Sequence, residues 1–384
     1  RALVERAGFG VLALETDWAD AALLDAYVHG EDAQAGEHGE AFARAPAWAW
    51  RSRATLELLA WLREHALGRP AGERVVVRGL DLYGRHASLH QVLDYLDAVD
   101  PRAARTARER FGCLTPWQAD PRTYGRAAPH GLYRSCEHEV VAMLRDLLER
   151  RLRSARGDAG EALDEAFQAR LLEAAERHYH ALYHGGGEAW DLRARHLFET
   201  LEALLARHGP DAKVVVWAHN AQTGDARGTE PGARGRLSLG QLVRGAHGER
   251  AYLVGQLTDR GTLLASRRWD GPPQACRLRA AHRASHEHLL RAGGLPAALF
   301  PLRTSRGEAL AQELSRPRLE RAVDVVYRPS SELSSHYFHA SLSLQLDEVV
   351  WIEQTSALRP LSAREERALP GSHPFSRPTV EMVG

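Results

Sequence analysis

The sequence predicts an α/β fold in three layers, α/β/α, with a mostly parallel central sheet and a helical insertion lobe. Two observations carry this prediction. Short, almost continuous apolar runs recur along the 384 residues, and segments with apolar residues at helical spacing separate them. Strands of this kind are typical of a parallel sheet that helices cover on both faces. The hydrophobic content of 44% is enough for a large core.

Each expected element follows from a local pattern of apolar and turn-forming residues. The apolar runs predict strands over Gly10–Leu14, Val75–Gly79, Val214–Trp217, Ala251–Gln256, Ala298–Pro301, Val323–Tyr327 and Val349–Ile352. Helical spacing predicts helices over Asp20–His29, Arg53–Ala66, Pro101–Phe111, Glu137–Ser154, Glu161–His184 and Asp191–His208.

The long helical stretch between the second and third strands divides the chain into four parts. It contains few β-branched residues, so we expect residues 137–208 to form a helical insertion or lid. Residues 1–136 and 209–359 would then form the two parts of the α/β core, and residues 360–384 a tail that wraps the surface. The Gly- and Arg-rich segment Thr229–Arg236 predicts a mobile loop.

Composition excludes several classes of function. The formal net charge is zero, which gives no support for nucleic acid as a partner. No apolar run is long enough for a membrane span. The 3 cysteines lack CxxC spacing, so free thiols in the cytoplasm are expected. The GxxxxGK and GxGxxG nucleotide motifs and the GxSxG elbow of serine hydrolases are missing from the sequence, and we expect no cofactor or metal.

Polar residues follow three of the predicted strands. Glu15, Asp81 and His219 each stand near the C-terminal end of a strand, where open α/β sheets bind ligands. They predict a cleft with a histidine and two carboxylates that orient it or tune its pKa. The alternative is structural, because a carboxylate after a strand is often a helix N-cap or holds a turn.

Other constellations give weaker signals. Asn220 is the only asparagine of the chain and stands next to His219, where its amide could position a substrate or water. His180 and His184 have the spacing of two metal ligands, but a surface histidine cluster is the better interpretation. For the run His286-Glu287-His288, chance is the better explanation in a chain with 20 histidines.

The motifs taken together resemble the erythromycin esterase family, in particular its branch of succinoglycan-biosynthesis-like proteins. The resemblance rests on their order along almost the whole chain: LALETDWADA, AWAWRSR, RGLDLYGRHAS, AWDLRARHLFETL, VVVWAHNAQTGDAR, LSLGQLVR, VVYRPSSELSSHYFHA and VVWIEQTSALRPL. It implies a three-layer α/β fold with added helices and a deep cleft at the strand ends. It also implies hydrolysis of a macrolide lactone without a metal, through water that a histidine activates.

The resemblance assigns roles to individual residues. Glu15 matches the family's active-site glutamate, and His219 matches the first histidine of the HNAH motif, so these two are the expected catalytic residues. The expected substrate-binding residues are Arg51 of the WRN motif, Asp81 and Tyr83 of GLDLY, Arg193 of WNLRD, Asn220 and Gln222 of HNAH, and His336 and Tyr337 of SHYF.

The sequence departs from the family pattern at several of these motifs. Gln222 replaces the second histidine of HNAH, Ser52 replaces the asparagine of WRN, and WNLRD has Asp191 and Ala194 in place of its Asn and Asp. The family's GExxHG segment, whose histidine is the proposed base, would precede Arg1. Either that segment exists upstream of this sequence or the protein lacks the base.

Three functions are compatible with these residues. The first is a hydrolase for an ester or lactone of a bulky natural product. The second is a biosynthetic tailoring enzyme that catalyses acyl transfer, cyclisation or dehydration on a secondary metabolite or peptide, which the replacements at Gln222, Ala194 and Ser52 favour. The third is a non-catalytic protein that keeps the binding pocket. A small-molecule or peptide natural product is the expected partner in each case, and the sequence leaves the oligomeric state open.

Overall fold

The structure is a computed structural model that describes residues 1–31, 42, 47–81, 188–268, 271–304, 307–369 and 373–375. The chain divides into two compact units. The first unit holds Arg1–Glu15, Ala22–Arg78 and Leu201–Gly384, and the second holds Thr16–Ala21 and Gly79–Thr200. The predicted helices between Pro101 and His184, and Tyr83, lie outside the described residues.

One three-stranded sheet has β1 in its centre. Its strands are β2 (Val76–Asp81), β1 (Val11–Asp17) and β3 (Val214–Trp217), in the spatial order β2-β1-β3. β1 and β3 run parallel, with Val11 opposite Val214 and Leu14 opposite Trp217. The two strands therefore end at the same edge of the sheet.

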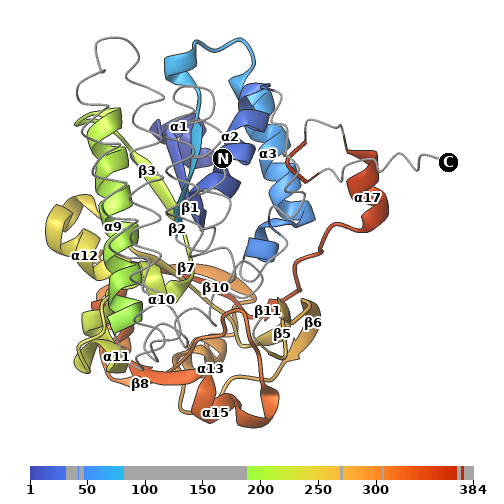
Figure 1. The fold of residues 1–384 in the computed structure, drawn as a ribbon. Helices are drawn as coiled ribbons and strands as arrows, with labels where there is room; N and C mark the ends of the chain where they lie inside the picture. Colours follow the sequence, from blue (N-terminus) through green and yellow to red (C-terminus); the bar gives the residue numbers. More distant parts are fainter. Residues whose placement is uncertain are drawn as a thin grey trace, which may run out of the picture. The chain divides into compact units, whose positions relative to one another are not determined.

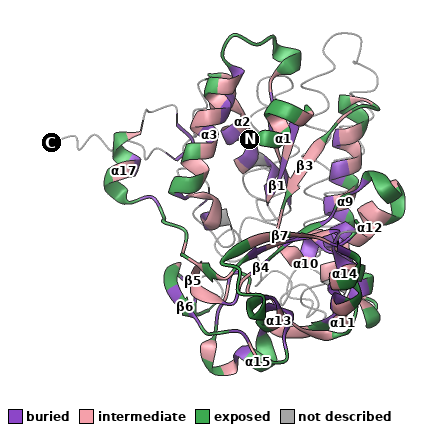
Figure 2. Cartoon of the chain, turned by 180° about the vertical axis from the view of Figure 1, so that it is seen from behind, coloured by how far each residue is buried: buried purple, intermediate pink, exposed green. Residues whose placement is uncertain are grey.

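Two helices pack against this sheet and bury its apolar side chains. They are α2 (Trp18–His29) and α3 (Arg53–Ala66), and the short α1 (Ala2–Ala7) precedes β1. Leu24 of α2 and Leu59 of α3 join Leu14 and Val77 of the strands in one core cluster. Figure 2 shows β1 as a buried strand, while the surface helices carry exposed and intermediate residues.

α3 begins where the side chain of Ser52 accepts a hydrogen bond from the Thr55 amide at 3.3 Å. This N-cap explains the departure of Ser52 from the family's asparagine, because both residue types cap helices well.

Among the described residues, the C-terminal half holds three further sheets (Figure 1). The first has the order β4-β10-β7, with β4 (Val254–Leu257), β10 (Glu348–Ile352) and β7 (Ala297–Pro301). The second has the order β11-β5-β6, with β11 (Gln354–Thr355), β5 (Arg260–Ala265) and β6 (Gln274–Leu278). The third pairs β8 (Arg318–Arg321) with β9 (Tyr337–Ala340).

The other helices among the described residues are mostly short, apart from α9. They are α9 (Glu188–His208), α10 (Asn220–Thr223), α11 (Glu230–Ala233), α12 (Leu239–His247), α13 (His286–Ala292), α14 (Glu308–Leu314), α15 (Glu332–Ser335), α16 (Leu342–Gln345) and α17 (Ala363–Ala368). Single 3-10 turns are η1 (Ala47–Trp50), η2 (Ala71–Glu73), η5 (Ala226–Gly228), η6 (Gly248–Arg250) and η8 (Pro329–Ser331). Trp351, which is fully buried, lies in the core cluster of this half.

The fold is mixed α/β, the class that the sequence predicted. The described strands form four sheets, and β10 pairs parallel with β4 but antiparallel with β7. The predicted strand Val323–Tyr327 is wrong: the segment makes one isolated bridge, between Val326 and Ser266. The carbonyl of Val323 instead accepts a hydrogen bond from a histidine side chain, so this residue pairs with no strand there.

Two further segments are more ordered than expected. The predicted loop Thr229–Arg236 is wrong, because it contains α11 with Thr229 as its N-cap. The tail beyond Pro360 contributes α17, and Phe375 is fully buried in the core cluster with Leu14. The prolines of the tail had predicted only a segment that wraps the surface. Instead, apolar contacts with distant parts of the chain hold part of the tail in the core.

Candidate active site

The parallel pairing of β1 with β3 brings Glu15 and His219 together. Glu15 stands directly after Leu14 on β1, and His219 stands two residues after Trp217 of β3. The Oε2 atom of Glu15 accepts a hydrogen bond from the His219 backbone N–H at 2.6 Å. Both residues are partly exposed, and the Glu15 carboxylate holds the backbone of His219 at this edge of the sheet.

A tryptophan of η1 packs against the same strand ends. The Nε1–H group of Trp50 donates to the backbone carbonyl of Glu15 at 3.2 Å. Its ring meets the ring of Trp217 edge to face, with centroids 5.7 Å apart. Trp50 therefore connects η1 to β1 through a hydrogen bond and to the end of β3 through ring packing.

Both ring nitrogens of His219 make hydrogen bonds to the backbone. Nδ1 accepts from the Ala221 N–H at 3.2 Å, which makes His219 the N-cap of α10. Nε2 lies 2.9 Å from the carbonyl oxygen of Val323. Because Nδ1 accepts from an amide, we assign the proton of the neutral ring to Nε2, which then donates to Val323. In this tautomer Nε2 can donate a hydrogen bond. The lone pair of Nδ1 is already used by the Ala221 N–H, so the ring would have to break that contact before it could accept a proton.

The two amide residues of the same motif have different surroundings. Asn220 donates to the backbone carbonyl of Gln256 at 2.7 Å and accepts from the Gln256 N–H at 3.0 Å, so it attaches α10 to β4. Gln222 is only 1% exposed, and neither polar atom of its amide has a hydrogen-bond partner among the described residues. A buried amide without partners is costly, which makes Gln222 the less easily explained of the two.

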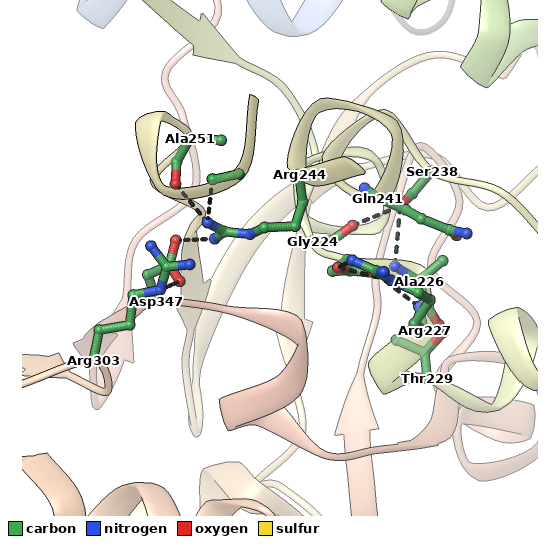
Figure 3. Close-up of polar contacts among 12 residues, drawn as sticks. Gly224, Ala226, Arg227, Thr229, Ser238, Gln241, Arg244, Ala251, Arg303 and Asp347 are labelled. Carbon is green, nitrogen blue, oxygen red and sulfur yellow. Dashed lines mark hydrogen bonds and ion pairs between the residues drawn. The ribbon is translucent and has the colours of Figure 1, made fainter. Parts of the chain in front are cut away.

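A serine from the next motif fixes the turn that follows α10. The hydroxyl of Ser238 donates to the Gly224 carbonyl at 2.7 Å and accepts from the Ala226 N–H at 3.1 Å (Figure 3). It also caps α12 through the Gln241 N–H. In the same view, Arg244 and Arg303 both pair with the buried Asp347. The Ser238 contacts hold the turn that follows α10, and the pairing of Arg244 with Asp347 holds α12.

Asp81 and Arg193 form a buried ion pair in the second unit. The guanidinium contacts both carboxylate oxygens, with Nε–Oδ1 at 3.1 Å and Nη2–Oδ2 at 2.6 Å. The side chains are 0% and 6% exposed. A two-point pair of this kind fixes both side chains, and losing one partner leaves a buried charge. The sequence predicted both residues as substrate contacts, and the structure shows that they are partners of each other.

His336 and Tyr337 lie in a separate polar cluster around Arg321. The Nε2 atom of His336 accepts from the Arg328 N–H at 3.0 Å, and burial lowers the pKa of the imidazole. The hydroxyl of Tyr337 accepts from the His282 N–H at 3.0 Å and from Arg321 Nε at 2.9 Å, and burial raises its pKa. Both side chains therefore hold neighbouring backbone segments.

Arg51 lies beside the tail. Its Nε–H group donates to Glu366 Oε1 at 2.8 Å, and Nη2 donates to the Phe375 carbonyl at 3.4 Å. The sequence predicted Arg51 as a substrate contact but contained no signal for its partner in the tail.

Sequence reasoning also missed a buried carboxyl pair. Glu287 of α13 and Glu320 of β8 are each 1% exposed. Burial, and then the charge of Glu287, raise the pKa of Glu320 to about 8. His286 is fully buried, and its Nε2 atom lies 2.7 Å from the Ala340 carbonyl oxygen. His286 and Glu287 begin α13, whose N-cap is Ser285, and both side chains are buried.

The described residues contain no group of three or more His, Cys, Asp or Glu residues that could hold a metal ion. None of their helices has the length and apolar character needed to cross a membrane.

Comparisons with known proteins agree with this architecture. A Bacillus cereus protein aligns with a TM-score of 0.75 at 19% identity, over 94% of this chain and 84% of its own. A succinoglycan biosynthesis protein gives 0.72 at 18% identity, over 94% of this chain and 83% of its own. A histidine-to-asparagine mutant of the erythromycin esterase EreC, in its open conformation, gives 0.62 at 15% identity, over 92% and 85%. The family model described as erythromycin esterase matches residues 4–355. The chain therefore belongs to the erythromycin esterase family.

Proposed function

We propose that the protein is a hydrolase that cleaves an ester or lactone of a bulky natural product by attack of water. One observation carries the proposal: a carboxylate and a histidine of the family motifs, Glu15 and His219, touch at the ends of two parallel strands. The family match over residues 4–355 supports an esterase-like chemistry for this pair. The proposal includes the finer fold expectation, a three-layer α/β/α arrangement with a mostly parallel central sheet.

Each residue would have a distinct role in the reaction. Glu15 would orient the attacking water or the histidine that activates it, which in the family pattern is the histidine of the GExxHG segment. His219 carries its proton on Nε2, so its ring would exchange the Val323 carbonyl for the developing oxyanion. Arg51 would add positive charge near that oxygen. Water attack would need no metal, as the resemblance implies.

The test is turnover of a panel of macrolide lactones and aromatic esters in heavy-oxygen water. Hydrolysis places one heavy oxygen in the acid product. Glu15→Gln and His219→Ala should each lower kcat by about 100-fold, the loss typical of one catalytic group. His339→Ala is the matched control, because that side chain is 61% exposed. Unchanged turnover in His219→Ala would remove this residue from the mechanism, and full activity after chelation is expected.

A second candidate is acyl transfer or cyclisation on a secondary metabolite or peptide. The specific observation is Gln222, a buried amide where the family has a histidine, because an amide cannot carry a proton. An internal nucleophile would then replace water, and the product would contain no heavy oxygen. Gln222→His should raise the labelled fraction if this residue decides between the two outcomes. A labelled product in the wild type and an unchanged ratio in the variant would exclude it.

A further inference from the structure

The side chain of Gln345 packs directly against the end of α10. A Cβ atom on Gly224, the C-cap of α10, would lie 2.7 Å from Nε2 and 2.8 Å from Cγ of Gln345, which is closer than real Cβ atoms come to other atoms. The backbone carbonyl of Gln345 also accepts from the Asp225 N–H at 2.9 Å. Glycine is therefore required at position 224, because the amide of Gln345 occupies the space of a side chain there.

One helical turn connects Gly224 to His219. The His219 carbonyl accepts from the N–H groups of Gln222 at 2.8 Å and Thr223 at 3.0 Å, and the Gly224 N–H donates to the Asn220 carbonyl at 2.8 Å. The Nδ1 atom of His219 caps the same turn. Because these hydrogen bonds fix the turn as one unit, a shift of Gly224 also moves the imidazole.

The Gln345 amide has a second neighbour, the buried carboxyl group of Glu320. A hydrogen bond joins the two side chains, which are 2% and 1% exposed. Each keeps one oxygen without a partner among the described residues, Oε1 of Gln345 and Oε2 of Glu320. Glu287 adds a third such oxygen, Oε2, while its Oε1 accepts from the Arg321 N–H at 2.7 Å. Buried oxygens without donors tolerate an added negative charge poorly.

The charged groups around Glu320 leave it neutral at pH 7. Burial, and then the charge of Glu287, raise its pKa to about 8, and the hydrogen bond with Gln345 offsets only part of this rise. The arginines of β8 have other partners, since Arg318 pairs with a glutamate of α14 and Arg321 with one of α15. The charged and titratable groups on β8 and on the elements around it are His286, Glu287, Glu313, Arg318, Arg321, Glu332, Tyr337 and His339.

We propose that Glu320 is a positioning residue, which in its neutral form keeps His219 in place through Gln345 and the turn at Gly224. The inference rests on the proposed function, because it concerns the orientation of His219 in the reaction. A second buried charge beside Glu287 requires either water or a shift of the chain. The Gln345 amide contacts both Glu320 and Gly224, so it passes this shift to α10. The hydrolase is then active while Glu320 is neutral and loses activity when this acid ionises.

The test is the pH profile of kcat for the wild type and for Glu320→Gln. An acid with a pKa of about 8 is about nine-tenths ionised at pH 9, so wild-type kcat should fall about tenfold there. Glutamine stays neutral, so kcat of the variant should stay level. Glu287→Gln should move the fall to lower pH, because it removes the charge that raises the pKa of Glu320. The control Glu313→Gln changes a half-buried carboxylate of α14 and should keep the wild-type profile. A wild type without the fall, or an equal fall in Glu320→Gln, would overturn the proposal.

A second measurement separates this proposal from the proposed function. The Cε1–H resonance of His219, assigned by its disappearance in His219→Ala, should shift with a midpoint at about pH 8 in the wild type. The shift should vanish in Glu320→Gln and in Gln345→Met, which keeps the length of the side chain but removes its amide. The shift in a protein that hydrolyses none of the esters would contradict the hydrolase proposal only. A wild-type resonance without the shift, or the same shift in either variant, would contradict the positioning role itself.

Discussion

Replacing Glu320 by glutamine is expected to stabilise the protein, and increasingly so as the pH rises. Glu320 lies on β8 at 1% exposure, and Oε2 has no hydrogen-bond partner among the described residues. Glu287, on α13, uses Oε1 to accept from the Arg321 N–H at 2.7 Å. Glutamine keeps the shape of the protonated acid and adds a donor next to a second carboxylate. Charged or titratable neighbours on the adjacent elements are His286, Arg318, Arg321, Tyr337 and Glu313.

The sign and size follow from the proton balance of Glu320. Its pKa is raised from 4.5 to about 8, first by burial and then by Glu287. Between these two values the folded state keeps a proton that the unfolded state has lost, so stability falls as the pH rises. At 1.36 kcal/mol per unit, the penalty reaches about 3 kcal/mol at pH 7 and grows little above pH 8. The variant removes this penalty and also relieves Glu287, whose pKa burial raises.

Urea unfolding followed by tryptophan fluorescence at pH 5, 6, 7 and 8 measures the effect. The stability difference between Glu320→Gln and wild type should increase along this series and level off above pH 8. Glu249→Gln is the matched control, because the Glu249 side chain is 92% exposed. A difference that stays constant with pH, or a variant less stable than wild type at pH 8, would refute the reasoning.

Three further changes test other parts of the structure. Arg193→Met should cost about 3–5 kcal/mol of stability, because it removes the guanidinium that contacts both oxygens of the buried Asp81 carboxylate. A cost below about 1 kcal/mol in urea unfolding would contradict the ion pair's burial. Gly79→Ala would place a Cβ atom 2.4 Å from a backbone oxygen of β1, so it should destabilise the protein by more than about 2 kcal/mol. In the control Gly10→Ala the new Cβ meets nothing within 4 Å and should cost less stability, so equal thermal shifts would argue against the close approach. Burial, and then Arg63, lower the pKa of His373 to about 4, so the protein should lose stability as the pH falls from 6.5 to 4. His373→Phe should abolish this loss in calorimetry, and an identical loss of stability at low pH in the variant would show that another group causes it.

The strands of the first sheet were predictable because their sequence signals are local. Val214–Trp217 was predicted with the bounds that β3 has, and Arg53–Ala66 with those of α3. β3 is a run of β-branched residues, and α3 has apolar residues at helical spacing. The local sequence was therefore sufficient to predict the conformation of both segments. Val323–Tyr327 has a similar composition, yet its backbone groups find other partners, and composition alone could not show this.

The meeting of Glu15 with His219 was predictable for a topological reason. Parallel neighbouring strands end at one edge, so residues that follow them come together whatever the rest of the chain does. The sequence could not show that both ring nitrogens of His219 have backbone partners, since Val323 is 104 residues away. Nor could it show that Asp81 and Arg193, predicted as substrate contacts, are paired with each other.

By itself, the sequence determined the family, the mixed α/β class and the pair of residues at the ends of β1 and β3. These depend on short patterns and on motif order, which a linear chain displays directly. Only the tertiary structure decided that Glu366, 315 residues from Arg51, holds its guanidinium, and that Glu287 and Glu320 share a buried position. Burial and charge pairing arise from surfaces that folding brings together, and no local pattern of residues records which surfaces those are.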